Sequence, residues 1–399
     1  MHSGYNLALV SAESAQELEK NIDLLRSNGG AVSGEYSKTG KYRTFAVYDS
    51  QEELLRVTAP ENRRAMNICD GKEYPAGTVF LFPGSGIHQK KMLTILNDVS
   101  GFFKRRLEEL DEICSQVYDV RLLDEDTEDE LADQLRVLAS EIAIAEHWEN
   151  IGCHADSIIG HSMGEYAAAV FAGIMSERDA FFLLKERCIA MSGNDGHCMA
   201  AAEASAERIM DIANAAGLNV TISAYNAPEI VTVCGVKRDM ELMSVICRNQ
   251  KIRFSLINGS RGGHYQGLRE CAEVFFKKAQ GITFHKPEKH FISTLDPEGT
   301  QYSPDTPEYW YAHIWQPVKF MQAVGKLVPE KVGRVIDVGV SPVLINMVMN
   351  NLGNIRTAWI PTVRAGRNYS RHILHSAGIA FNSGINIDLE REAQESAEQ

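Results

Sequence analysis

The stretch Ser157-Ile158-Ile159-Gly160-His161-Ser162-Met163-Gly164 joins a short apolar strand to a helical pattern that begins near residue 163. A serine between two glycines at such a junction is typical of a nucleophile elbow, a tight turn that exposes a reactive hydroxyl above a sheet. The turn needs small residues at 160 and 164 because it brings backbone segments close together. Amides at the start of the helix then point toward any oxyanion that forms. Ser162 is therefore a candidate nucleophile, and an ordinary glycine-flanked turn is the alternative.

Strands and helices alternate on both sides of this turn. A strand at 78–82 runs into Pro83-Gly84-Ser85-Gly86. Helices are expected at 92–118, 127–149, 163–172 and 177–192. This alternation favours a parallel sheet in an α/β domain. Between Cys198 and Ile257 the predicted order changes to βαββαβ, the ferredoxin-like split unit, which we interpret as a small inserted subdomain.

The predicted organisation has five parts. Residues 1–74 form an N-terminal α/β unit of the linker type. Residues 75–197 and 258–360 are the two parts of a large α/β-hydrolase-like subdomain, and residues 198–257 are the ferredoxin-like subdomain inserted between them. Residues 361–399 form a C-terminal linker segment, whose charged end is expected to fray.

Composition and charge exclude several classes of function. The net charge of −13 argues against nucleic acid and anionic membrane as partners, because phosphate contacts need clustered lysine and arginine. No apolar run approaches the ~18 residues of a membrane span, and the N-terminus lacks the features of a signal peptide, so a cytoplasmic protein is expected. Eight cysteines without a C-x-x-C pair predict reduced thiols and no zinc site. We expect no metal and no redox cofactor.

A serine hydroxyl is a weak nucleophile and needs a base nearby. The chain has twelve histidines, and spacing alone cannot choose among them. His161 follows the strand directly, and its place on the elbow directs it away from the serine. His264 lies in the glycine-rich connection Arg261-Gly262-Gly263-His264-Tyr265, just after the inserted subdomain, which is a suitable place for a catalytic loop.

Several other segments follow one another in a characteristic order. They are Phe82-Pro83-Gly84-Ser85-Gly86-Ile87-His88, Gly160 to Tyr166, Arg187, Ala224-Tyr225-Asn226-Ala227-Pro228, Gly263-His264-Tyr265, Tyr309-Trp310, Pro317 to Phe320 and Val338 to Leu344. Together they resemble the acyltransferase domains of modular polyketide synthases and the related malonyl transacylases of fatty acid synthesis. Leu9 to Ala12, Ile360 to Arg367 and Gly384 to Asp388 look like the linkers that flank such domains. The chain thus looks like a piece of a larger synthase, or a stand-alone copy that kept both linkers.

The resemblance implies a role for each matching residue. Ser162 would attack a donor thioester, and His264 would act first as general base and then as general acid to the departing thiol. A backbone carbonyl would orient the histidine, so the pair needs no third acid. Asp337 is a possible third member, but we interpret it as an ordinary strand-end residue. The backbone amides of Ser85 and Met163 would hold the oxyanion.

The resemblance also implies a substrate site. Arg187 would bind the free carboxylate of a malonyl-type donor, which suits the fork of a guanidinium; a surface ion pair is the alternative. Asn226 would line the pocket near this carboxylate. His161, Gly263 and Arg261 are assigned to the same site.

Two departures from the family pattern matter: the first changes the packing around a loop, and the second concerns selectivity. Ser85 and His88 stand where the family's FPGQGSQ has its two glutamines. The tetrapeptide that ends at the catalytic histidine is typically HAFH for malonyl and YASH for methylmalonyl, whereas here it is Arg261-Gly262-Gly263-His264. Gly263 in place of phenylalanine leaves more space beside the α-carbon of the acyl group. This favours an α-substituted extender unit, with polar ones such as hydroxy-, methoxy- or aminomalonyl among the candidates.

The expected function is transfer of such an extender unit from coenzyme A or a carrier protein to an acyl carrier protein. The setting would be polyketide or hybrid polyketide/nonribosomal peptide biosynthesis, as in antibiotic production, with a ketosynthase as a neighbour. Four alternatives stay open: a plain malonyl-CoA:acyl carrier protein transacylase, an editing acyl-thioester hydrolase, a non-catalytic docking module of a synthase, and a general serine esterase.

Overall fold

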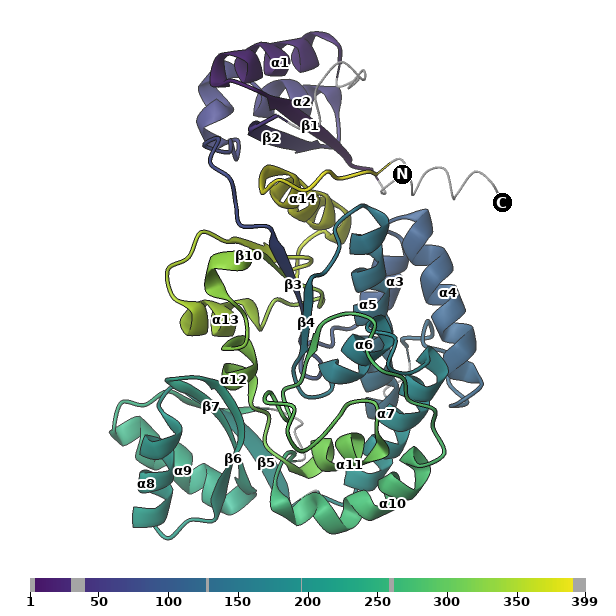
Figure 1. The fold of residues 1–399 in the computed structure, drawn as a ribbon, viewed down its shortest axis with the longest axis vertical. Helices are drawn as coiled ribbons and strands as arrows, with labels where there is room; N and C mark the ends of the chain where they lie inside the picture. The colour runs from purple at the N-terminus through teal and green to yellow at the C-terminus, as the bar shows by residue number, and fades with distance from the viewer. Residues whose placement is uncertain (1–3, 30–39, 127–128, 195, 258–261, 390–399) are drawn as a thin grey trace.

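The computed structural model describes residues 4–29, 40–126, 129–194, 196–257 and 262–389 of the chain. Its centre is a sheet of five parallel strands in the order β11-β10-β3-β4-β9. Figure 1 labels β10, β3 and β4 of this sheet. They span Ala358–Pro361 (β11), Val332–Asp337 (β10), Gly77–Phe82 (β3), Ser157–Gly160 (β4) and Phe291–Ile292 (β9). The α/β prediction is confirmed, and Ser162 follows the carboxyl end of β4.

The strands of this sheet are buried on both faces, as expected for parallel strands between helices. Phe80, Phe82 and Ile158 point into the larger core, while Val79, Leu81 and Ile159 point into the smaller one. The larger core takes in α3 (Met92–Asn97), α4 (Gly101–Ser115), α5 (Glu130–Asn150), α6 (Gly164–Phe171), α7 (Glu177–Met191), α10 (Arg269–Ala279) and α11 (Pro307–Trp315). The smaller core takes in α12 (Phe320–Val324) and α13 (Ile345–Leu352), and short 3₁₀ turns lie at Gln266–Leu268 and Pro329–Lys331.

The single helix predicted at 92–118 is wrong. The chain forms two helices there, because Ser100 has an extended backbone and its Oγ accepts the N–H of Phe103. A serine in this conformation caps a new helix. Asp129 caps α5 in the same way, with its Oδ1 accepting the N–H groups of Leu131 and Ala132.

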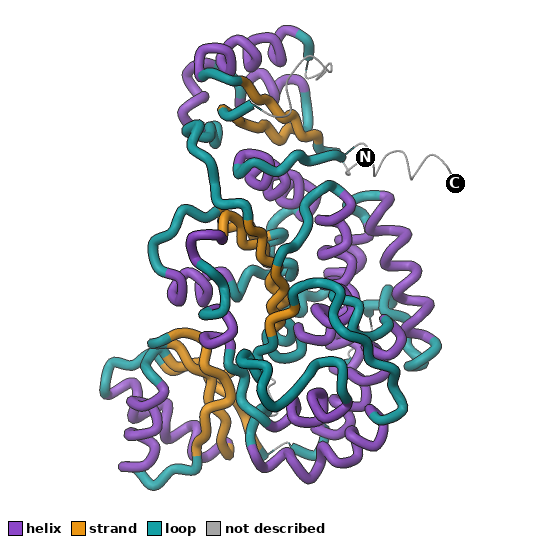
Figure 2. Tube along the Cα trace, viewed as in Figure 1, coloured by secondary structure: helices purple, strands orange, loops and turns teal. Residues whose placement is uncertain are grey.

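The small subdomain is an antiparallel sheet of four strands with two helices on one face (Figure 2). Its elements are β5 (His197–Ala202), α8 (Ala206–Ala215), β6 (Val220–Ala227), β7 (Ile230–Val236), α9 (Lys237–Asn249) and β8 (Phe254–Ile257). The strand order β6-β7-β5-β8 is that of a ferredoxin-like unit, as predicted. Strand β6 also bonds to the large subdomain, since Tyr225 N–H donates to Val318 O at 2.8 Å and Val318 N–H donates to Ser223 O at 2.9 Å.

The two ends of the described chain pack together. The N-terminal unit consists of β1 (Asn6–Ala12) paired antiparallel with β2 (Tyr42–Tyr48), with α1 (Ala15–Ser27), α2 (Gln51–Val57) and a 3₁₀ turn at Pro60–Ala65. Helix α14 (Tyr369–Asn382), which the sequence analysis did not predict, lies beside β2 (Figure 1). Arg43 on β2 donates to the carbonyls of Phe381 and Ile385, each at 3.0 Å.

Within the described residues, no helix is both long enough and apolar enough to cross a membrane. The same part of the chain contains no group of three or more histidine, cysteine or acidic side chains placed to hold a metal ion. All eight cysteines are free thiols.

Candidate active site

The turn between β4 and α6 has the geometry of a nucleophile elbow. Ser162 has φ of +53°, the left-handed region that is unfavourable for a residue with a side chain. A Cβ at Gly160 would lie 2.5 Å from the Cα of Glu165, and one at Gly164 would collide with the carbonyl oxygen of Phe82. Glycine is therefore required at both positions. The strained backbone persists because packing on both sides of the turn enforces it.

His264 approaches Ser162 from a distant part of the chain. Its Nε2 lies 2.6 Å from Ser162 Oγ, and its Nδ1 lies 3.0 Å from the carbonyl oxygen of Gln316. A carbonyl only accepts, so Nδ1 carries the proton and the lone pair of Nε2 faces the serine hydroxyl. The His264 N–H also donates to the carbonyl of Ile314 at 3.1 Å.

Electrostatics keep this imidazole neutral. His264 is 3% exposed, and its burial, with a further contribution from the nearby charge of Arg187, lowers its pKa to about 3. At neutral pH the Nε2 lone pair is therefore free to accept the hydroxyl proton of Ser162.

The loop after β3 lies against the elbow. A Cβ at Gly84 would collide with the amide of Gly164, so the two backbones are in contact there. The N–H of Gly84 donates to Glu141 Oε1 at 2.6 Å, which fixes the loop to helix α5. The next amide, that of Ser85, and the amide of Met163 donate to no described residue. Two backbone donors are thus available near Ser162.

Glu141 was missed by the sequence analysis. It is fully buried on α5, and this burial raises its pKa to about 8. A signal was present, because Glu141 is the only charged residue in the apolar run 137–145. A lone carboxyl in such a run needs a hydrogen-bond partner in the core, and here the partner is the loop that carries Ser85.

Arg187 is a buried cation on the face of α7 that points inward. It is 7% exposed, and no ion pair joins it to a residue that the structure describes. Its Nε has no hydrogen-bond partner in that part of the chain. The described residues therefore do not form the surface ion pair with Arg187 that the sequence left open as an alternative. A buried guanidinium without a counter-ion is costly and calls for an anion.

His161 and Asn226 meet beside the elbow. His161 Nε2 lies 2.8 Å from Asn226 Oδ1, and Asn226 Nδ2 donates to Thr232 Oγ1 at 3.0 Å. The His161 ring stands edge-on to Phe320. His161 thus bonds to the small subdomain and not to Ser162, which agrees with the direction expected of it.

Gly263 leaves open space beside His264. A Cβ there would lie 3.5 Å from Met191 Cε and 3.8 Å from Met199 Sδ, both ordinary contact distances. Two flexible thioether side chains therefore border the place that phenylalanine occupies in HAFH. Arg261 lies outside the described residues.

Two further sequence candidates lie away from the reacting groups. Asp337 accepts the N–H groups of Gly339 and Leu344, each at 3.1 Å, and so caps the start of α13; it has no bond to His264. Its burial raises its pKa to about 7. His88 Nε2 lies 3.2 Å from Asp133 Oδ1 on α5.

Glu165 forms a buried network that the sequence analysis also missed, although it lies within the quoted Gly160–Tyr166 segment. Its Oε1 accepts both the N–H and the Oγ1–H of Thr294 at 2.6 Å, and its Oε2 accepts the hydroxyl of Tyr309 at 2.6 Å. Tyr309 is on α11, and the chain at the end of α11 supplies the carbonyls that hold His264. The network therefore ties the helix that follows Ser162 to the segment whose carbonyls bind His264.

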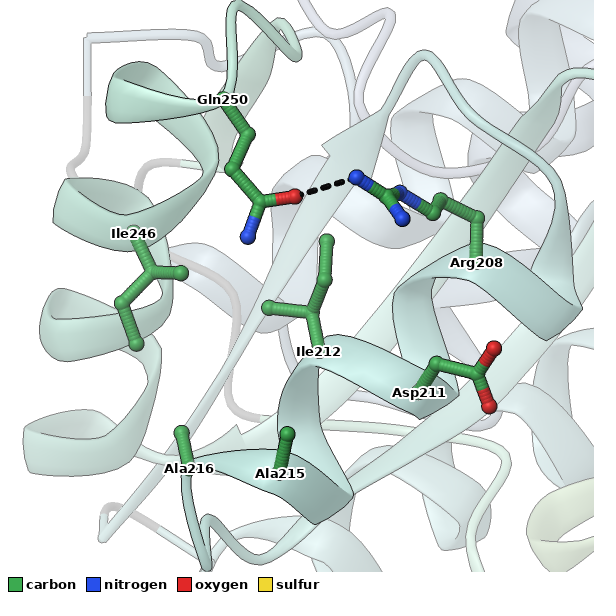
Figure 3. A pocket seen from close by; sticks show the side chains of 7 residues that line it. All are labelled: Arg208, Asp211, Ile212, Ala215, Ala216, Ile246 and Gln250. Atoms are coloured by element: carbon green, nitrogen blue, oxygen red, sulfur yellow. Dashed lines mark hydrogen bonds between the residues drawn. The ribbon is translucent and has the colours of Figure 1, made fainter.

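One hollow on the described surface lies elsewhere, between α8 and α9 (Figure 3). It measures about 670 Å³ and is lined by Arg208, Asp211, Ile212, Ala215, Ala216, Ile246 and Gln250. Arg208 and Gln250 bond across it at 2.6 Å. It shares no residue with the group around Ser162.

The chain is similar to known acyltransferases in sequence. A family model described as the acyl transferase domain matches residues 79–386. The non-reducing polyketide synthase ntnG of Nectria sp is 25% identical over 421 residues, which cover 96% of this chain and 20% of the synthase. The mycoketide-CoA synthase of Mycobacterium tuberculosis is 27% identical over 339 residues, covering 81% and 8% respectively. The chain thus spans a fifth or less of the length of these relatives.

Solved structures share the fold. The acyltransferase domain from module 8 of the salinomycin polyketide synthase has a TM-score of 0.87 at 23% identity, with 98% of each chain covered. The malonyl-CoA:acyl carrier protein transacylase of Xanthomonas oryzae has a TM-score of 0.65 at 20% identity, covering 73% of this chain and 96% of that one.

Proposed function

Since this chain belongs to the acyl transferase domain family, we propose that it transfers a malonyl-type extender unit from a thioester donor to an acyl carrier protein. The transfer would pass through an ester on Ser162. The observation that supports this most is the buried Arg187 without a counter-ion, close enough to His264 to lower its pKa. A donor that carries a free carboxylate supplies the missing anion. Carrier protein and ketosynthase are the partners that this role requires in polyketide biosynthesis.

The first half-reaction acylates the serine. As Ser162 Oγ bonds to the thioester carbonyl carbon, its proton passes to His264 Nε2, and the carbonyl oxygen becomes an oxyanion between the amides of Ser85 and Met163. Collapse breaks the carbon–sulfur bond, and the imidazolium gives its proton to the sulfur. One such oxyanion donor is typically worth ~3 kcal/mol in the transition state.

The second half-reaction runs the same steps in reverse with a new thiol. The carrier's thiol gives its proton to His264 and attacks the acyl-serine, and Ser162 leaves with that proton. Water in place of the thiol would make the enzyme a hydrolase. An acyl group without a carboxylate cannot pair with the buried Arg187 cation. Arg187 therefore counts against a hydrolase that acts on uncarboxylated acyl groups.

We also propose that the extender unit is α-substituted. The space at Gly263 supports this, because a substituent on the α-carbon would occupy the volume that phenylalanine fills in HAFH. Met191 and Met199 border the space, and thioethers adapt to groups of different shape. Hydroxy-, methoxy- and aminomalonyl remain the candidate polar units.

The test is intact-protein mass spectrometry after incubation with an equimolar panel of malonyl, methylmalonyl, hydroxymalonyl, methoxymalonyl, aminomalonyl and acetyl thioesters. Each donor is offered on coenzyme A and on carrier protein. We expect one covalent adduct whose mass equals an α-substituted malonyl group, and its loss on adding a carrier thiol. A dominant malonyl adduct would reject α-substitution. Free acid without carrier acylation would indicate the hydrolase, and an unmodified chain with intact donors would indicate a docking module.

Gly263→Phe is the matched variant for this panel. It should lower kcat/KM for α-substituted donors by about 10- to 100-fold and leave malonyl within a few-fold, because a pocket rejects a group that no longer fits by ~1–3 kcal/mol. Gly263→Ala should fall between the two, since its Cβ meets neighbours only at ordinary contact distance. Equal losses for all donors would show that position 263 does not face the substituent.

The pH profile of kcat/KM should not fall near pH 6.5, where an ordinary histidine becomes protonated. His264 acts as a base only when neutral, and its pKa is lowered to about 3, so it stays neutral as the pH falls through 6.5. We expect kcat/KM to stay within about twofold from pH 8 to pH 5, whereas a base with a pKa of 6.5 would lose about 30-fold at pH 5. Initial rates are measured where circular dichroism shows the chain folded. A limb near pH 6.5 would contradict the prediction.

A further inference from the structure

The backbone that carries His264 is poorly constrained by its own sequence. Two glycines precede the histidine, and glycine allows more backbone conformations than any other residue. Gly262 has φ of +70° and His264 has φ of +56°, so a left-handed residue that carries a side chain must be held in place there. Something outside residues 262–264 has to fix their path.

Two side chains bind successive carbonyls of this segment. Asn194 Nδ2 donates to the carbonyl of Gly262 at 3.2 Å, and Ser223 Oγ donates to the carbonyl of Gly263 at 2.7 Å. Asn194 lies just after α7 in the large subdomain, and Ser223 lies on β6 in the small one. The glycine pair is therefore held from both subdomains.

Tyr265 orients the Asn194 amide. The Tyr265 hydroxyl donates to Asn194 Oδ1 at 2.8 Å, so the amide oxygen faces the tyrosine and the amide nitrogen faces Gly262. The His197 ring stacks on the Tyr265 ring, with centroids 4.8 Å apart and an angle of 28°. The Asn194 N–H bonds to the carbonyl of Met191 at 3.1 Å, which anchors the asparagine to the end of the helix that carries Arg187.

We propose that Asn194 and Tyr265 are positioning residues that act through His264. Tyr265 fixes the Asn194 amide, the amide fixes the Gly262 carbonyl, and the fixed glycine pair keeps His264 Nε2 at Ser162 Oγ. Neither residue touches the acyl group in this scheme. The inference rests on the proposed function, because it supposes that His264 activates Ser162.

The experiment measures single-turnover acylation of Ser162 and donor affinity in Asn194→Ala and Tyr265→Phe. Each variant should acylate about 10- to 100-fold more slowly, because a small misplacement of a catalytic group costs rate in that range. Each should bind a non-transferable malonyl thioether as tightly as the native chain. Tyr265→Phe removes only the hydroxyl, so the test does not depend on whether Asn194→Ala folds. Ser192→Ala, an exposed hydroxyl that bonds only to the Ile189 carbonyl among described residues, is the matched control and should be unchanged.

Two combinations separate positioning from a general structural effect. Asn194→Ala plus Tyr265→Phe should be no slower than Asn194→Ala alone, because the tyrosine acts through the asparagine. In a His264→Ala background, Asn194→Ala should leave the residual acylation rate unchanged. The inference would be overturned by a further tenfold loss in that background or by additive effects in the double variant. Single variants that acylate as fast as the native chain would also overturn it. If the native chain itself forms no acyl-Ser162, the proposed function fails instead.

Discussion

Replacing Ser162 with alanine is expected to lower the rate of carrier acylation by at least about 10³-fold and to abolish the covalent adduct. The Ser162 hydroxyl lies 2.6 Å from His264 Nε2. Ser162 lies just before the N-terminus of α6, where backbone amides are available to an oxyanion. Alanine keeps the Cβ, so the left-handed backbone at this position is no more strained than before. The melting temperature should therefore stay within a few degrees of the native value. Rates and adducts are both measured by intact-protein mass spectrometry.

The chain supplies a matched control on the same strand. Ser157 opens β4, and its Oγ lies 3.0 Å from Nδ1 of His290, so it forms a second serine–histidine hydrogen bond. Ser157 lies at the opposite end of the strand from the elbow and has no glycine-flanked turn behind it. Ser157→Ala should transfer acyl groups at the native rate. A Ser162→Ala variant within tenfold of native activity would show that the acyl group does not pass through this serine.

The elbow and the fold class could be predicted because their causes are local. Gly160 and Gly164 are required by contacts with Glu165 and Phe82, and this requirement leaves a pattern in consecutive residues. Buried parallel strands are apolar on both faces, so β3 and β4 stand out in the sequence as short apolar runs. The βαββαβ order of the small subdomain is visible for the same reason.

The pairing of His264 with Ser162, and the groups that hold His264, could not be predicted from the residues alone. Ser162 and His264 are 102 residues apart, and the group that orients His264 is a backbone carbonyl at Gln316, which has no side-chain signature. Helix α14 is amphipathic, but nothing local shows that it packs on β2. The break between α3 and α4 depends on Ser100, whose capping role required an extended backbone that the apolar periodicity does not report.

Replacing Arg187 with alanine should change the choice of donor more than the chemistry at Ser162. We expect kcat/KM for carboxylated donors to fall by about 10²- to 10³-fold, because truncating one partner of a buried charge pair costs ~2–5 kcal/mol. Acetyl thioesters should be used at least as well as before, since they have no carboxylate to pair. The kcat/KM values for carboxylated donors and for acetyl thioesters are compared in one competition assay. Arg178→Ala is the control, because Arg178 is an exposed arginine at the start of the same helix.

The stability of the donor-free enzyme tests the same assignment independently. A buried guanidinium without a counter-ion destabilises the fold, so Arg187→Met, which keeps much of the apolar stem, should melt no lower than the native chain. A structural ion pair would give the opposite result. Equal losses with acetyl and malonyl donors, together with a lower melting temperature, would show that Arg187 supports the fold and does not bind the donor.

In the proposed role, Arg187 should also link donor binding to the basicity of His264. Its positive charge contributes to the lowered pKa of His264, after the larger effect of burial. A donor carboxylate that pairs with Arg187 neutralises this charge and should raise the pKa of His264 in the donor complex. The base then becomes stronger when a carboxylated donor is bound, so part of the selectivity should appear in kcat and not only in KM. On acidification, kcat/KM should begin to fall at a higher pH in Arg187→Ala than in the native chain, because the pKa of His264 is higher without the arginine charge. An unchanged onset of the fall would show that this charge does not affect the pKa of His264.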